Sequence, residues 1–211
     1  MKKNLTSIFA LTILFFAFKI GEEKTIEPIS IGTPAPKTDL KMMDISGKEI
    51  SISEIKKDNG LLVIFSCNTC PFVIAWEDRY PGLAEMCEKN NIGMALVNSN
   101  EAKRKGDDSL DEMKKHAREK NYHCFYSLDE NSVLANAFGA KSTPHVFLFD
   151  KDLKLAYRGA IDDTEGKEKQ PKDHYLIDAI VNMTSGKTIA PNDTKAVGCS
   201  IKRAKAEDCK K

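Results

Sequence analysis

Apolar residues in this chain form short runs that are separated by polar segments. Leu61–Phe65 is a continuous apolar run, and Ile92–Asn98 contains a second one. Runs of this kind are typical of strands that are buried on both faces of a sheet. The segments 41–44 and 49–52 flank Ile45-Ser46-Gly47-Lys48, a sequence typical of a hairpin turn. The pattern therefore predicts an N-terminal hairpin followed by two central strands.

Helical segments are predicted between the strands. Residues 68–89 fit a helix with a break at Pro81-Gly82. Ser109 and Glu112 form a capping box in front of a helix that ends near Lys120. The remaining predicted elements are strands at 124–128, 145–149 and 153–158, and helices at 131–138 and 174–184. This alternation predicts a layered α/β domain with a partly parallel sheet.

Residues 1–21 are predicted to be an export signal or an N-terminal anchor. Lys2 and Lys3 precede an apolar stretch of 14 residues, 5–18. A membrane-spanning helix needs about 20 apolar residues, so the stretch is short for a span and typical of a targeting segment. Ala17-Phe18-Lys19 is a poor cleavage site, so a cleaved signal and a membrane tether both stay open. We expect the protein in the bacterial periplasm or cell envelope, or secreted.

Length and charge limit the other possibilities. A chain of 211 residues suits one domain of ordinary size, which we expect at 26–188 with a C-terminal tail at 189–211. Lys and Arg number 32 against 31 Asp and Glu, so there is no basic surplus for a nucleic-acid partner. Six cysteines are too few for a small fold held together by disulfides.

The motif Cys67-Asn68-Thr69-Cys70 carries the candidate chemistry, because it follows the 61–65 strand directly and opens the next helix. The start of a helix has unpaired N–H groups and a partial positive charge, which favour a thiolate over a thiol. We expect Cys67 to be reachable and Cys70 to be more buried, with both sulfurs within disulfide reach. The predicted chemistry is attack of the Cys67 thiolate on a substrate disulfide, followed by resolution by Cys70.

A structural disulfide or half of a zinc site would use the same two cysteines. A zinc site of that kind needs a second ligand pair, whereas Cys87 and Cys124 stand alone in the sequence. The order strand, Cys-x-x-Cys, helix favours redox chemistry.

Six stretches, spread over residues 31–202, resemble the signature of a thioredoxin-fold family that is labelled peroxiredoxin-like or redoxin-type. They are 31–36, Phe65-Ser66-Cys67-Asn68-Thr69-Cys70-Pro71-Phe72-Val73, 98–100, 139–144, 157–163 and 198–202. The resemblance implies a thioredoxin-like fold, with a mixed central β-sheet flanked by helices, here extended by the N-terminal hairpin.

The resemblance also implies that Pro144 is a cis-proline facing the cysteine pair. A cis X–Pro bond costs little, and it would leave the backbone of Thr143 free to pair with an extended substrate. From the residues alone, Pro144 also fits a proline at the start of a strand.

The family resemblance and the motif predict an exported thiol–disulfide oxidoreductase without a cofactor. Its partners would be protein or small-molecule disulfides and thiols, and an unidentified redox partner. The family label also suggests a thiol peroxidase, but peroxiredoxins use a Pro-x-x-x-Thr/Ser-x-x-Cys loop. Gly60 and Ile64 stand at these positions before Cys67, and Val63 stands at the first one before Cys70. We therefore expect weak or absent direct peroxidase activity.

Two further residues are candidates for a role at the site. Cys199, in the tail, is either an accessory redox thiol or a free or structurally paired cysteine. His145 follows Pro144 and either tunes a thiolate or points away from the pair. With Cys67 and Cys70, His145 would form a soft site for Cu(I), so a redox-inactive copper-binding module is the alternative function.

Overall fold

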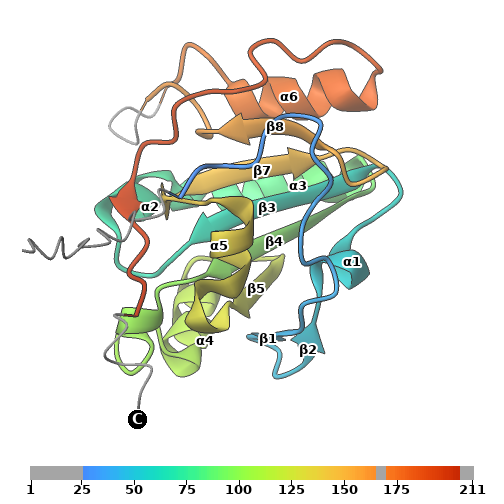
Figure 1. Cartoon of the computed structure of the whole chain (residues 1–211). Coiled ribbons are helices and arrows are strands. Elements are labelled where there is room, and N and C mark those ends of the chain that lie inside the picture. Colours follow the sequence, from blue (N-terminus) through green and yellow to red (C-terminus); the bar gives the residue numbers. More distant parts are fainter. Residues whose placement is uncertain (1–25, 165–169, 205–211) are drawn as a thin grey trace, which may run out of the picture.

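The computed structural model describes residues 26–164 and 170–204 (Figure 1). The segment predicted as a signal peptide or anchor, residues 1–21, lies outside the described residues. Within the described part of the chain, no helix is both long enough and apolar enough to cross a lipid bilayer.

A mixed sheet of seven strands forms the centre of the fold (Figure 1), in the order β2-β1-β5-β4-β3-β7-β8. Strand β3 pairs in parallel with β4 and antiparallel with β7. The predicted mixed central sheet is therefore confirmed. The strand bounds are β1 Met42–Asp44, β2 Glu49–Ile50, β3 Gly60–Ser66, β4 Ile92–Asn98, β5 Phe125–Leu128, β7 His145–Phe149 and β8 Leu155–Gly159.

Helices cover both faces of this sheet. The α-helices are α1 Ile52–Ile55, α2 Pro71–Trp76, α3 Tyr80–Lys89, α4 Leu110–Glu119, α5 Val133–Phe138 and α6 Tyr175–Thr184. Short 3-10 helices are η1 Glu77–Arg79, η2 Glu101–Lys103 and η3 Glu130–Ser132. Leu62 and Ile64 of β3 pack with α2, α3, α4 and α6, while Leu61, Val63 and Phe65 pack with α1 and α5. Alternate residues of one strand thus fill two separate cores.

The predicted N-terminal hairpin is confirmed, because β1 pairs antiparallel with β2. Its second strand is shorter than predicted, since residues 51 and 52 belong to the start of a helix. Ser51 is the N-cap of α1, and Glu54 completes a capping box with it. In a capping box, side-chain oxygens accept hydrogen bonds from backbone N–H groups at the start of the helix. In a strand, these N–H groups would need a neighbouring strand as their partner.

The helix predicted over residues 68–89 consists of three pieces. It begins at Pro71 and is interrupted at η1, Glu77–Arg79. The predicted break at Pro81-Gly82 is wrong, because Pro81 lies in the first turn of α3. A proline costs little there, since the first N–H groups of a helix have no partner within the helix.

A second, small sheet was not expected from the sequence. Strand β6, Ser142–Thr143, pairs antiparallel with β9, Cys199–Ser200. In Figure 1, β9 is the red strand beside the beginning of α2. Part of the segment predicted as a C-terminal tail therefore packs against the domain.

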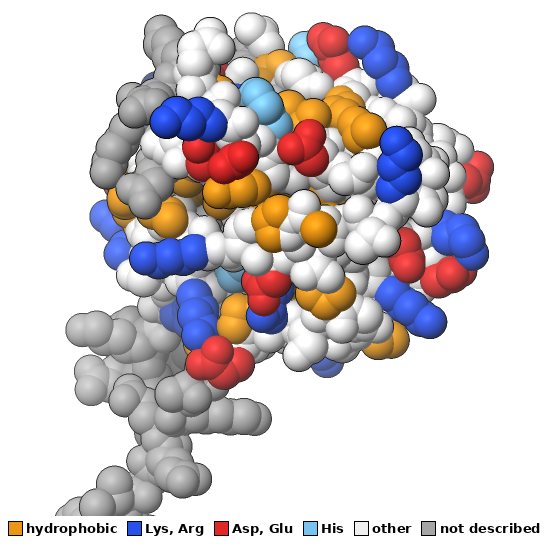
Figure 2. Space-filling view, turned by 90° about the horizontal axis from the view of Figure 1, so that it is seen from above, with side chains coloured by type: hydrophobic (Ala, Val, Ile, Leu, Met, Phe, Trp, Pro, Cys, Tyr) orange, Lys and Arg blue, Asp and Glu red, His pale blue; other side chains and the backbone are white. Residues whose placement is uncertain are grey.

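The face that α6 covers shows no large patch of one charge (Figure 2). Hydrophobic side chains lie there between acidic and basic ones. Ile177 and Val181 of α6 are 40% and 44% exposed. The mixture of acidic and basic side chains on this face is consistent with the small net charge of the sequence.

Candidate redox site

The two cysteines of the motif lie at the end of β3 and the beginning of α2. Cys67 is 1% exposed and Cys70 is 5% exposed, so both side chains are buried. The expectation that Cys67 is the reachable sulfur is therefore not met in this structure. Because α2 begins at Pro71, Cys70 is the N-cap of the helix, the position expected for Cys67.

Thr143 lies opposite both cysteines. The bond from Thr143 to Pro144 is cis, as predicted. The Cys67 Sγ lies 3.4 Å from Thr143 Oγ1, and the Cys70 thiol donates to the carbonyl oxygen of Thr143 at 3.1 Å. The structure thus brings Cys67, Cys70, Thr143 and Pro144 together as the sequence predicted. The backbone of Thr143 is not free, however, because it is paired with Cys199 of β9.

The surroundings of the pair favour one thiolate, at Cys70. A hydrogen bond from the Cys67 thiol lowers the pKa of Cys70, and further donors are the Cys199 thiol and the N–H of Val73. Burial works against this by raising the same pKa. The pKa of Cys67 is raised by its hydrogen bond with Cys70, by burial and by the nearby charge of Asp108. The Thr143 hydroxyl is a fourth donor that lowers the pKa of Cys70. A Cys70 thiolate would give up only the bond that its thiol donates to the Thr143 carbonyl oxygen.

The loop between the cysteines is fixed by Asn68. Its backbone N–H donates to Asp108 Oδ1 at 2.9 Å, and its Nδ2 donates to the carbonyl oxygen of Asp107 at 2.7 Å. The hydroxyl of Tyr126 donates to Asn68 Oδ1 at 2.8 Å. Thr69, in contrast, is exposed. The motif therefore presents one anchored residue and one solvent-facing residue.

Asp108 was missed by the sequence analysis as part of this site. It is fully buried and also accepts from Asn98 Nδ2 at 2.8 Å and from Asn100 Nδ2 at 3.0 Å. The stretch 98–100 matches the family signature, and this is the signal that pointed to a structural role nearby. The sequence alone does not show that the partner of this stretch is the carboxylate of Asp108, which lies in a charged loop.

His145 faces the opposite side of the sheet from the cysteines. It is 4% exposed, its ring lies 4.5 Å from that of Phe147, and its Nδ1 accepts the N–H of Lys141 at 3.4 Å. Phe147 belongs to the core under α1 and α5, whereas Cys67 and Cys70 belong to the other core. Burial lowers the pKa of His145 to about 4.

This placement removes His145 from the predicted copper site. In addition, the described residues contain no group of three His, Cys, Asp or Glu side chains placed to hold a metal ion. The sequence suggested proximity because His145 follows Pro144, but successive residues of a strand point to opposite faces.

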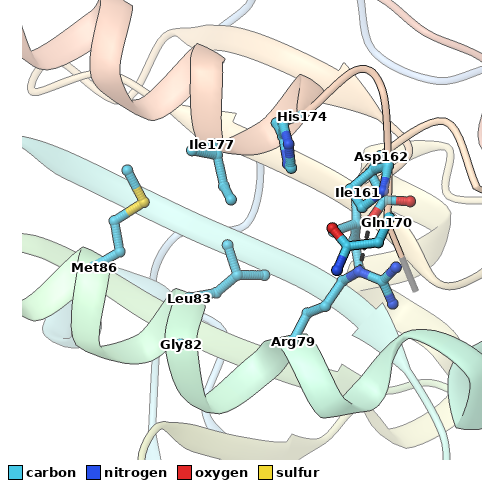
Figure 3. A pocket seen from close by; sticks show the side chains of 10 residues that line it. Arg79, Gly82, Leu83, Met86, Ile161, Asp162, Gln170, His174 and Ile177 are labelled. Carbon is cyan, nitrogen blue, oxygen red and sulfur yellow. Dashed lines mark ion pairs between the residues drawn. The ribbon is translucent and has the colours of Figure 1, made fainter.

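A cavity of about 380 Å³ lies between α3 and α6. Figure 3 shows Arg79 at one end, in an ion pair with Asp162. The Arg79 Nε lies 2.6 Å from Asp162 Oδ2, and Trp76 Nε1 donates to Asp162 Oδ1 at 2.8 Å. Asp162 therefore ties the end of α2 to the segment after β8. None of the described lining residues is a cysteine, so the cavity does not include the thiols.

Comparison with known proteins identifies the relatives of the chain. The profile of the AhpC/TSA family matches residues 31–158. A conserved protein of uncharacterised function from Geobacillus kaustophilus is 30% identical, with 84% of this chain and 93% of that chain covered and a TM-score of 0.77. A hypothetical protein from Sinorhizobium meliloti 1021 is 28% identical, with 84% and 97% covered and a TM-score of 0.77.

A more distant structure shares only the fold. The peroxidoxin BcpB of Mycobacterium tuberculosis is 14% identical, with 74% of this chain and 97% of that chain covered and a TM-score of 0.57. The predicted thioredoxin-like fold is therefore confirmed. No curated protein sequence matches the chain at a significant level.

Proposed function

This chain belongs to the AhpC/TSA family, and we propose that it is a thiol–disulfide oxidoreductase that exchanges disulfides through Cys67 and Cys70. One observation carries the proposal: at the start of α2, both sulfurs lie within hydrogen-bonding distance of Thr143, the residue before the cis-proline. Family membership supports thiol-based redox chemistry in general. The cysteine pair makes exchange the activity that the site supports best.

The proposed exchange runs in two steps. A thiolate of the pair attacks one sulfur of a substrate disulfide, which forms a mixed disulfide and releases the other half of the substrate as a thiolate. The second cysteine of the pair then loses its proton and attacks the protein sulfur of the mixed disulfide. The products are the Cys67–Cys70 disulfide and the fully reduced substrate, so two electrons pass from the protein to the substrate.

We assign the attacking sulfur to Cys70, because it is the N-cap of α2, where the helix start favours a thiolate, and because neighbouring donors lower its pKa. Cys67 then acts as hydrogen-bond donor in the resting state and as resolving thiol in the second step. This order is the reverse of the one predicted from the sequence, in which Cys67 attacks. The two orders predict opposite trapping results, so one experiment separates them.

The experiment uses reduced protein, glutathione disulfide and a Cys199→Ser background. Adding Cys67→Ser should leave a glutathione adduct on Cys70, whereas adding Cys70→Ser should leave almost no adduct, measured by intact mass after acid quench. An adduct on Cys67 in the Cys70→Ser protein would support the order predicted from the sequence. Cys124→Ala is the matched control and should behave as the background does. If neither the background protein nor any variant reacts with glutathione disulfide faster than free glutathione does, the proposed function is wrong.

We further propose that the protein works outside the cytoplasm on protein or small-molecule disulfides and thiols. The support is the apolar stretch 5–18 behind Lys2 and Lys3, which lies outside the described residues. Fractionation of cells that produce the full chain tests this proposal. Recovery in the cytosolic fraction alone, without processing of the N-terminus, would contradict it.

Direct peroxide reduction is the second activity that the family includes. Neither cysteine follows the proline and hydroxyl residues of a peroxiredoxin loop, and Arg79, the first arginine after the motif, is in an ion pair with Asp162. We therefore expect hydrogen peroxide to oxidise the reduced protein at about the rate of a free thiolate. Stopped-flow measurement with wild type and Cys70→Ser checks this. Peroxide consumption orders of magnitude above that of a free thiolate would show a thiol peroxidase instead.

A further inference from the structure

The edge of β6 that faces the cysteine pair is occupied by the chain itself. Strand β9 pairs with it in antiparallel register, Ser142 with Ser200 and Thr143 with Cys199. Gly198 approaches so closely that a Cβ there would lie 2.3 Å from the carbonyl oxygen of Thr143. An extended substrate pairing with Thr143 would need this same edge.

Hydrogen bonds hold the segment after Cys199 in place. The N–H of Ile201 donates to the carbonyl oxygen of Lys141 at 3.1 Å. Lys202 donates its N–H to Asn100 Oδ1 at 2.8 Å, and its carbonyl oxygen accepts the N–H of Ala102 at 2.8 Å. Since Asn100 also binds the buried Asp108, the segment is attached to the same polar cluster that fixes the motif.

The pairing places the sulfur of Cys199 at the cysteine pair. The register sets Cys199 opposite Thr143, whose carbonyl oxygen accepts from the Cys70 thiol at 3.1 Å. Cys70 and Cys199 also influence each other's titration, because Cys199 lowers the pKa of Cys70 and Cys70 raises the pKa of Cys199. Cys199 is only partly buried and packs against the core that contains Cys67 and Cys70. Cys70 therefore has two neighbouring thiols, the buried Cys67 and the more exposed Cys199.

We propose that β9 holds Cys199 as a second resolving thiol for Cys70. Because β9 also occupies the Thr143 edge, it restricts the substrates of the site to small disulfides. The inference rests on the proposed function and specifies its substrate class and resolving step. After attack on glutathione disulfide, Cys70 carries glutathione in a mixed disulfide. The Cys199 thiol loses its proton and attacks the Cys70 sulfur, which forms the Cys70–Cys199 disulfide and releases the second glutathione as a thiolate.

The first test is a disulfide map of Cys67→Ser after reaction with glutathione disulfide. We expect a Cys70–Cys199 disulfide, found by peptide mass after alkylation. The Cys67→Ser/Cys199→Ser protein should instead retain glutathione on Cys70, and Cys67→Ser/Cys124→Ala is the matched control that should keep the disulfide. If Cys67→Ser retains glutathione on Cys70 with Cys199 as a free thiol, the inference is wrong. In that case wild type still forms the Cys67–Cys70 disulfide, whereas failure of the proposed function leaves wild type unreacted as well.

The second test displaces β9 without changing a cysteine. Gly198→Ala introduces the clash with the Thr143 carbonyl, while Gly106→Ala, in a loop where a Cβ has its nearest neighbour at 3.9 Å, is the control. We expect the rate of insulin reduction, relative to the rate with glutathione disulfide, to rise in Gly198→Ala and to stay constant in Gly106→Ala. An unchanged ratio in Gly198→Ala would contradict restriction by β9.

Discussion

Buried polar side chains hold the cysteine motif in place at the scale of single residues. Asp108 accepts the backbone N–H of Asn68, the residue directly after Cys67, and two further amide groups. A buried donor that loses its acceptor costs about 1–3 kcal/mol, so such a cluster fixes the loop more firmly than exposed polar contacts would. The geometry of the sulfurs thus depends on a residue far from them in sequence.

Asp108→Asn should lower the pKa of Cys67, because the charge of Asp108 is one of the causes that raise it. It should also destabilise the fold by about 1–3 kcal/mol, since a carboxylate acceptor is replaced by an amide that cannot accept every bond. The pH dependence of Cys67 alkylation, in a Cys70→Ser/Cys199→Ser background, measures the first effect. Asp107→Asn is the control, because the Asp107 side chain is exposed and only its carbonyl oxygen contacts Asn68. An identical pH profile for Asp108→Asn and the background would contradict this account.

His145 should make the fold less stable in acid. Burial lowers its pKa from 6.5 to about 4, so between these values the unfolded chain binds a proton there that the folded protein does not. Stability is therefore lost as the pH falls through this window, by roughly 3 kcal/mol in total. His145→Asn keeps an acceptor for the N–H of Lys141 and removes the titration.

Urea unfolding at pH 7 and pH 4.5 checks the His145 prediction. The loss of stability between the two values should be smaller in His145→Asn than in wild type, while His123→Asn, at an exposed position, should match wild type. Equal losses in wild type and His145→Asn would show that this histidine does not carry the effect.

At the scale of elements, the sequence predicts the helices and strands that are long enough to show a pattern of apolar residues. The continuous apolar runs correctly gave β3 and β4, because every residue of both strands is buried. Strands β6 and β9 have two residues each, too few to leave a hydrophobic pattern, and they pair over more than fifty residues of intervening chain. Helix α1 was missed for a similar reason, since four residues cover little more than one turn and leave no repeated pattern.

Gly93 in β4 should be sensitive to any side chain. A Cβ there would lie 2.0 Å from the carbonyl oxygen of Ile55 at the end of α1. Gly93→Ala should therefore push α1 away from the sheet and cost about 1–3 kcal/mol of stability. Gly82→Ala, in α3 with open space around it, should be neutral or stabilising by up to about 1 kcal/mol. Denaturant midpoints compare the two, and a Gly93→Ala protein as stable as wild type would contradict the packing described here.

At the scale of the whole molecule, the sheet brings together residues that the sequence lists far apart. The pair Cys67 and Cys70 follows β3, Thr143 precedes the neighbouring β7, and Cys199 arrives from the C-terminal segment. The motif and the family resemblance predicted that Cys67, Cys70 and Thr143 share a site. It left Cys199 open and placed His145 in a possible metal site, because only the register of the strands decides which side chains share a face.

The central claim is that Cys67 and Cys70 form a reversible redox couple. The most direct measurement is the glutathione redox equilibrium of the protein, read by mass after thiol trapping in wild type and in Cys70→Ser. Wild type should show a two-electron couple between Cys67 and Cys70 that is absent from Cys70→Ser. A potential near −270 mV, about that of thioredoxin, would indicate a reductant, and one near −120 mV an oxidant. If Cys67 and Cys70 stay free thiols at every glutathione ratio, the account is contradicted.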